Sequence, residues 1–211
     1  AILSVDFPDA IGELEAALGA LSIPIEEIIG SGGGETKGTQ RLRRALAELG
    51  WHKVNFTIEK RINGVQRESI SHEVDHVRTF ADGRVIALEI EWNNKDPFFD
   101  RDLENFKRLH AEGAISVGVI VTRGSSLQDD MVQLVRRFAT ERGLESSDDL
   151  GSLGLTPTPR QKADVARRMR AGGATFADAW SLSFVKDKYG AATTHWRKLE
   201  DLSLIHISEP T

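Results

Sequence analysis

Three carboxylates, Asp75, Glu89 and Glu91, have residue types and spacing that suit chemistry at a metal ion. Glu89 and Glu91 lie two residues apart in the run 84–92, so on a β-strand both side chains would share one face. Asp75 lies in the run 69–77, which predicts a neighbouring strand across a short turn. Carboxylates gathered at one sheet edge repel each other unless a cation lies among them, and a divalent ion with oxygen ligands is the usual solution. The pattern therefore favours metal-assisted phosphodiester hydrolysis.

The spacing is equally compatible with a second interpretation, in which the carboxylates are solvent-facing charges on an exposed sheet face. Ile86, Leu88 and Ile90 alternate with the two glutamates and would then form the buried face. The sequence leaves both interpretations open at this point.

A third interpretation comes from His72-Glu73-Val74-Asp75-His76, which matches the zinc-protease pattern H-E-x-x-H. That motif works on a helix, where residues four apart share a face. The surrounding alternation of polar and apolar residues predicts a strand instead, which would place His72 and His76 roughly 13 Å apart. We therefore disfavour a zinc protease, which would require a helix here and a bound zinc ion.

Composition and charge narrow the class of protein. The chain has 211 residues, no Cys and a net charge of -5, which fits one soluble, intracellular domain without disulfides or thiolate metal sites. The charge is uneven: residues 1–35 contain seven acidic and no Lys or Arg side chains, whereas residues 159–198 contain nine basic and three acidic ones. The basic segment fits a polyanion partner and equally fits a solvated helical face.

The elements that would position the carboxylates follow from periodicity and turn signals. Asn63-Gly64 predicts a hairpin, the strands from Val54 to Trp92 form an antiparallel meander, and the apolar run 114–121 predicts a central strand buried on both faces. This order predicts a mixed sheet covered by helices on both sides. Helices are expected over 8–21, from a Thr39 cap to Gly50, from an Asp100 cap to Gly113, from Ser126 through Phe138, and over 160–171, 176–188 and 193–199, with loops at 30–34 and 145–159.

The segments 71–77, 87–106, 115–123 and 188–196 together resemble the BglII/BamHI-type branch of the type II restriction endonucleases. The resemblance runs from about residue 33 to 199. It implies the restriction-endonuclease-like fold, an α/β (mixed α+β) architecture with a central mixed sheet of about five strands flanked by helices.

The resemblance also implies a site of the D…(D/E)-x-K plan. Asp75 and Glu89 would be metal ligands together with the Ile90 carbonyl, and Glu91 would stand at the third position as a metal ligand or general base. Lys95 follows Glu91 by four residues and does not occupy that position. Two candidates for an accessory polar residue are Glu35 and Gln40, and the candidates for DNA contact are Asn93, Asn94, Lys95, Arg123, Ser125, Ser126, Thr193, Thr194 and His195.

The activity implied by the resemblance is Mg²⁺-dependent hydrolysis of a palindromic double-stranded DNA site, leaving 5′-phosphate ends. Mn²⁺ would substitute for Mg²⁺, two copies of the chain would form a homodimer, and a cognate DNA methyltransferase would accompany it in the cytoplasm of a prokaryote. The alternatives are a non-specific or structure-specific nuclease of the same fold and a non-catalytic DNA-binding module that relies on the basic segment.

The expected organisation is a single endonuclease domain over residues 1–201. The chain has no initiator Met, and residues 202–211 read as translated sequencing-adapter sequence rather than native protein. We therefore expect both ends of the domain to be incomplete.

Overall fold

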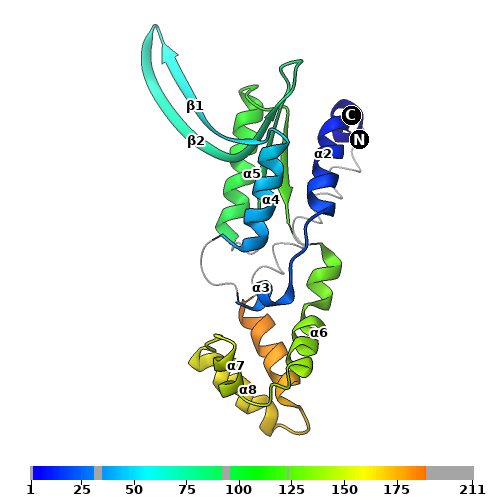
Figure 1. The fold of residues 1–211 in the computed structure, drawn as a ribbon. Coiled ribbons are helices and arrows are strands. Elements are labelled where there is room, and N and C mark those ends of the chain that lie inside the picture. Colours follow the sequence, from blue (N-terminus) through cyan, green and yellow to red (C-terminus); the bar gives the residue numbers. More distant parts are fainter. Residues whose placement is uncertain (1, 31–34, 92–95, 123, 189–211) are drawn as a thin grey trace. The chain divides into compact units, whose positions relative to one another are not determined.

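The computed structural model describes residues 2–30, 35–91, 96–122 and 124–188 (Figure 1). The chain divides into two compact units. The first comprises Ala1–Ser22, Glu35–Trp92 and Pro97–Thr122, and the second comprises Ile23–Gly34, Asn93–Asp96 and Arg123–Thr211. A sheet and its helices form the first unit, and helices form the described part of the second.

The sheet of the first unit has the strand order β1 (His52–Ile62), β2 (Val65–Thr79), β3 (Val85–Ile90) and β4 (Val117–Val121). The first three strands form an antiparallel meander, and β4 pairs parallel to β3. This is the mixed sheet expected from the sequence, with four strands in the described residues rather than about five.

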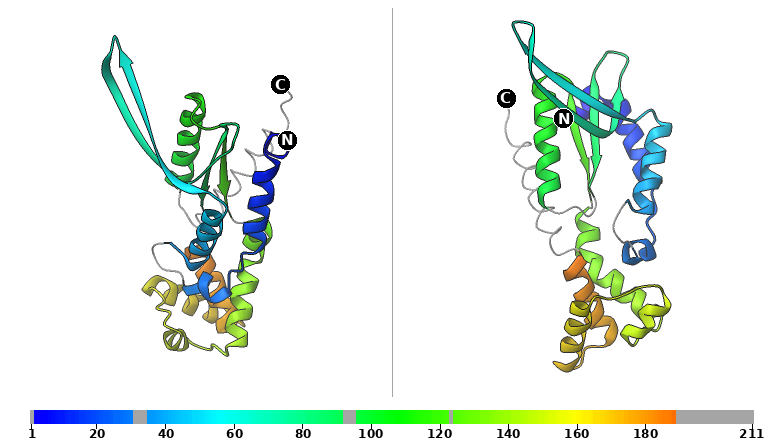
Figure 2. Two further views of the ribbon diagram at one scale, coloured as in Figure 1. Left: turned by 45° about the horizontal axis from the view of Figure 1, so that its top comes forward. Right: turned by 90° about the vertical axis from the view of Figure 1, so that its left-hand side faces the viewer.

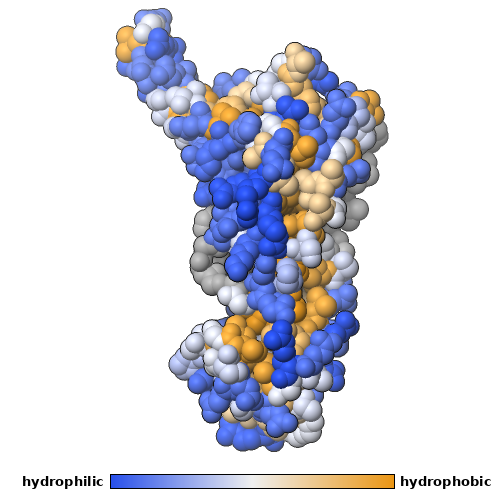
Figure 3. All heavy atoms as spheres, in the orientation of Figure 1, coloured by the Kyte–Doolittle hydropathy of each residue, from blue (hydrophilic) through white to orange (hydrophobic). Residues whose placement is uncertain are grey.

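The hairpin between β1 and β2 turns at Asn63 and Gly64, which have φ angles of 51° and 80°. Two consecutive positive φ angles are typical of a type I′ turn, which confirms the turn predicted from Asn-Gly. The two strands extend as a ribbon beyond the rest of the sheet (Figure 2). Its surface is largely polar (Figure 3), and Ile62 and Val65 are exposed beside the turn.

Two apolar cores pack on opposite faces of the sheet. Ile86 and Leu88 of β3 pack in one core with the inward faces of α2 (Pro8–Gly19) and α4 (Lys37–Glu48). Ala87 packs in the other core with Phe106 and Leu109 of α5 (Asp96–Ala111). A Cβ atom on Gly118 of β4 would lie 2.6 Å from the Phe106 ring, so glycine allows α5 to approach closely.

The described helices of the second unit surround an aromatic cluster. Trp180 contacts the rings of Phe138, Phe176 and Phe184, with centroids 5.5–6.5 Å apart. These helices are α3 (Ile25–Gly30), α6 (Ser125–Glu141), α7 (Ser147–Ser152), α8 (Pro159–Arg170) and residues 176–188. The last two confirm the predictions for 160–171 and 176–188, whereas the predicted helix 193–199 lies outside the described residues.

Several sequence predictions of local structure were wrong. The strand β4 lies at an edge of the described sheet, not at its centre. Its run is apolar because Val117 and Val119 pack in the core of α2 and α4, whereas Ile120 packs in the core of α5. Two helix starts were also wrong, because Thr36 rather than Thr39 caps α4 and because α5 begins at Asp96 rather than after Asp100. The predicted loop 145–159 contains the helix α7. The helices α1 (Ile2–Asp6) and α3 were not predicted.

Candidate active site

Asp75 lies at an irregularity of β2. His52 pairs with Val77 but Val54 pairs with Val74, so β2 contains one more residue than β1 over this stretch. Such a β-bulge changes which face the following side chains occupy. As a result Val74 and Val77 both pack in the core of α5, and the Asp75 backbone N–H donates to Oε1 of Glu89 across 3.4 Å.

Glu89 and Glu91 are buried, with only 8% and 5% of their surface exposed. Glu89 alternates with Ile86, Leu88 and Ile90 along β3, so its side chain leaves the sheet on the side of α5. The backbone N–H of Glu91 donates to the Val121 carbonyl (2.8 Å), which continues the β3–β4 ladder past the end of β3. The interpretation of the glutamates as solvent-facing charges is therefore wrong.

The electrostatics of this region are those of crowded carboxylates. Burial raises the pKa of Glu89 to about 8, and the negative charges of Asp75 and Asp102 add to the shift. Burial also raises the pKa of Glu91 to about 8, together with a hydrogen bond to the Asp102 side chain and repulsion from it. A carboxyl with such a pKa holds its proton near neutral pH unless a cation stabilises the charged form.

Asp102, which the sequence analysis did not select, is the most buried of these acids. Its side chain is 2% exposed, and its Oδ1 accepts a hydrogen bond from Nε of Arg101 (3.0 Å) and forms an ion pair with Nη2 of the same residue (2.9 Å). A signal was present in the sequence, because Asp102 lies four residues before Phe106 and seven before Leu109 on the inward stripe of α5. An acid on an apolar stripe is unusual enough to mark a candidate site residue.

Lys53 of β1 is a second residue that the sequence analysis missed. Its Nζ lies 2.9 Å from Oδ1 of Asp75 and 2.8 Å from Oε1 of Glu73. Hydrogen bonds to Glu73 and Asp75 raise the pKa of Lys53 above its ordinary value. Only the register of β1 against β2 brings this ammonium to Asp75, and spacing along the chain does not show that register.

The remaining predicted site residues have contacts or positions that do not test their predicted roles. Glu35, just before α4, pairs with Arg43 in the middle of that helix (3.1 Å), and Gln40 Nε2 donates to the Glu35 carbonyl (3.3 Å). Their accessory role stays a prediction. Ser125 is the first residue of α6, and Ser126 is exposed in its first turn. The other candidates for DNA contact lie outside the described residues: Asn93, Asn94, Lys95, Arg123, Thr193, Thr194 and His195.

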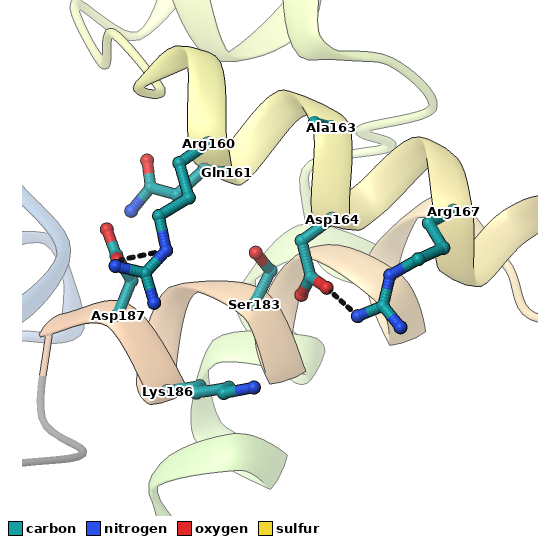
Figure 4. Close-up of a pocket in the computed structure, with 8 residues that line it drawn as sticks. All are labelled: Arg160, Gln161, Ala163, Asp164, Arg167, Ser183, Lys186 and Asp187. Carbon is teal, nitrogen blue, oxygen red and sulfur yellow. Dashed lines mark hydrogen bonds and ion pairs between the residues drawn. The ribbon is translucent and has the colours of Figure 1, made fainter.

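In the helical unit, a hollow lies between α8 and residues 176–188. It has a volume of about 220 Å³ (Figure 4). Arg160 pairs with Asp187 at 3.8 Å, and Arg167 pairs with Asp164. The carboxylates lining the hollow thus neutralise part of the basic segment. Its lining residues are Arg160, Gln161, Ala163, Asp164, Arg167, Ser183, Lys186 and Asp187.

The zinc-protease interpretation is wrong, because His72 and His76 lie on β2 rather than on a helix. In the described part of the chain, no three Asp, Glu or His side chains form a ready-made metal cage. The acids around Glu89 and Glu91 still fit a divalent cation chemically, since they offer hard oxygen donors and repel each other without one.

The described helices include none with the length and apolar character needed to cross a membrane.

A family model described as restriction endonuclease BglII/BglIII matches residues 1–202. No curated protein and no solved structure matches the chain. Because the family match spans nearly all of the 211 residues, the chain belongs to the BglII/BglIII family of type II restriction endonucleases, enzymes that cleave DNA at specific sites.

Proposed function

We propose that this restriction endonuclease is Mg²⁺-dependent and hydrolyses phosphodiester bonds in a palindromic double-stranded DNA site, leaving 5′-phosphate ends. The observation that carries the proposal is the pair of buried glutamates, Glu89 and Glu91, beside Asp75 and Asp102. Burying acids together destabilises a fold, so such a pair is typical of a site whose function requires the charge.

The residues that would hold the metal ion are Asp75, Glu89, Glu91 and the carbonyl of Ile90. All their donor atoms are oxygens, which Mg²⁺ prefers and which Mn²⁺ also accepts. A bound divalent cation neutralises charge on the scissile phosphate and lowers the pKa of water.

Within this site, Glu91 orients the attacking water and accepts its proton. The water oxygen attacks phosphorus in line with the 3′ oxygen. The bond between phosphorus and the 3′ oxygen then breaks, which leaves a 3′ hydroxyl on one product and a 5′ phosphate on the other. Glu91 suits this task because it is buried beside Glu89, and a bound cation would keep its carboxyl in the charged form that can accept a proton.

A two-fold homodimer would supply one active site to each strand of a palindromic target. The host would protect its own copies of that target with a cognate DNA methyltransferase of the same specificity. The candidate residues for reading the bases remain those predicted from the sequence.

Removing the ammonium beside Asp75 is expected to tighten metal binding. In Lys53→Met the cation no longer competes with Lys53 for the Asp75 carboxylate, so the Kd for Ca²⁺ should fall about two- to fivefold, the range of an exposed ion pair. Calorimetric titration with Ca²⁺ in the absence of DNA measures this change. Lys60→Met, on the same strand but opposite Glu68, should leave the Kd unchanged. Weaker Ca²⁺ binding in Lys53→Met would contradict the competition.

Digestion of phage DNA and of a supercoiled plasmid tests the proposed function. With Mg²⁺ we expect discrete fragments that can be ligated without prior phosphorylation, and with EDTA we expect none. A smear would favour the non-specific nuclease, and binding without cleavage would favour the DNA-binding module. Nicked rather than linear plasmid as the end product would contradict the two-fold dimer.

A further inference from the structure

Asp102 of α5 is a buried carboxylate with only half of its hydrogen-bonding capacity used. Arg101 donates to Oδ1, whereas Oδ2 has no hydrogen-bond partner among the described residues. Burial of a charged oxygen without a partner strongly destabilises a protein unless something satisfies it. An apolar residue at this position would pack with Phe106 and Leu109 at no such cost.

The charged groups around Asp102 come from three elements. Arg101 lies beside it on α5, and both Glu91 and Glu89 leave the adjoining sheet towards it, Glu91 closely enough for a hydrogen bond. His72 of β2 is the fourth ionisable neighbour. The guanidinium of Arg101 therefore faces three acidic side chains, and Oδ2 of Asp102 has no partner in the part of the chain that the structure describes.

We propose that Asp102 is a fourth acidic residue of the metal site, with Oδ2 directed to the cation's ligand shell. The inference rests on the proposed function, because it concerns the same Mg²⁺ ion. Arg101 holds the carboxylate through Oδ1 and so leaves Oδ2 available. In this arrangement the helix α5 contributes to the site as well as the two strands, and a cation satisfies the oxygen that the protein leaves unpaired.

A purely structural role as the partner of Arg101 makes a different prediction for metal binding. If Asp102 only anchored Arg101, its replacement would destabilise the protein and leave metal binding unchanged. If Asp102 belongs to the metal site, its replacement weakens metal binding, whatever it does to the stability of the metal-free protein.

The experiment compares Asp102→Asn with Asp100→Asn, an exposed aspartate on the same helix. Calorimetric titration with Ca²⁺ should show at least about tenfold weaker binding in Asp102→Asn, the usual effect of a residue that supports a metal site. The rise in Tm on adding saturating Ca²⁺, measured against EDTA, should be smaller for Asp102→Asn than for wild type. Asp100→Asn should match wild type in both measurements. Unchanged Ca²⁺ affinity in Asp102→Asn, with or without a lower Tm, would overturn the inference.

A second variant keeps the test decisive if Asp102→Asn folds poorly. Arg101→Gln removes the ion pair but retains the acid, so it should bind Ca²⁺ at least as tightly as wild type. Loss of Ca²⁺ binding in Arg101→Gln would assign the effect to the ion pair and overturn the inference. Failure of the proposed function is distinguishable from both results, because the wild-type protein would then cleave no DNA with Mg²⁺.

Discussion

Replacement of Glu89 by Gln is expected to lower the single-turnover rate of DNA cleavage by about 10³-fold or more. Glu89 is a predicted metal ligand, and a lost metal ion removes several kcal/mol of stabilisation from the charged transition state. Asp75→Asn should have an effect of the same size, because its carboxylate is a proposed ligand of the same ion and lies on the residue whose backbone contacts Glu89. Both variants should still bind the target duplex, since each removes a negative charge that repels the phosphate backbone.

Glu73→Gln is the matched control for these variants. Glu73 lies on the same strand as Asp75 and contacts the same Lys53 ammonium, but it is exposed and has no predicted role in the metal site. Its replacement should change the cleavage rate by less than about threefold. Cleavage by Glu89→Gln at the wild-type rate would show that the reaction does not use this cluster.

The variant Glu91→Ala distinguishes two roles of Glu91 that the sequence left open. If Glu91 mainly orients water, Glu91→Ala loses cleavage but keeps its affinity for Ca²⁺. If it is mainly a ligand, the same variant loses both. Calorimetry and single-turnover kinetics on one preparation therefore assign the role.

The candidate site was recognisable from the sequence only in part. The two-residue spacing of Glu89 and Glu91 placed both carboxylates on one face, because strand geometry repeats every two residues. Whether that face is buried depends on how α5 packs on the sheet, and the sequence does not show this packing. The spacing therefore left burial undecided, and the structure resolves it in favour of buried acids.

Asp75, Lys53 and Asp102 illustrate why the rest required a structure. A β-bulge at Asp75 changes the alternation along β2, and periodicity contains no signal for the extra residue. Lys53 reaches Asp75 through cross-strand register, and Asp102 reaches Glu91 through the rotation of a helix about its axis. Each contact joins residues 11 to 22 positions apart in the sequence and depends on tertiary packing, which local patterns do not determine.

The long helices and the hairpin were predictable for the opposite reason. Their signals are local: an apolar stripe in α6, and the Asn63-Gly64 turn. The helix α7 was missed because it spans only six residues and depends on burial of Leu150 and on the capping box of Ser146 with Asp149. Short helices of this kind are stabilised by packing rather than by propensity.

Without metal, the protein is expected to become less stable as the pH rises from about 7 to 9. Glu89 and Glu91 have pKa values of about 8 in the folded protein, against 4.5 ordinarily. Between these values the folded state binds more protons than the unfolded state, so raising the pH favours unfolding. The stabilisation that the two protonated carboxyls contribute is complete below about pH 4.5 and is lost as the pH rises past about 8. The expected decrease is roughly 2 to 5 kcal/mol, and urea unfolding in EDTA at several pH values measures it.

Measurements of stability above pH 7 separate the contribution of Glu89 and Glu91 from that of the buried histidines. Burial lowers the pKa of His72 and of His76 below 6.5, so these residues lose stabilisation only as the pH falls through and below that value. The double variant Glu89→Gln, Glu91→Gln should show a nearly flat profile between about pH 7 and 9. A wild-type profile as flat as that of the double variant would contradict the raised pKa values.

A divalent metal ion should counteract this loss of stability between about pH 7 and 9. A divalent cation binds the deprotonated carboxylates, so its affinity should rise with pH and each binding event should release protons. With saturating Ca²⁺ the wild-type protein should therefore be more stable at pH 8.5 than without it, and the gain should shrink towards pH 6.5 as protons compete for the same oxygens. Calorimetry in two buffers of different ionisation enthalpy counts the protons released. A release close to zero at pH 7 would mean that the cation binds away from Glu89 and Glu91, because carboxyls with pKa values of about 8 must lose protons to become ligands.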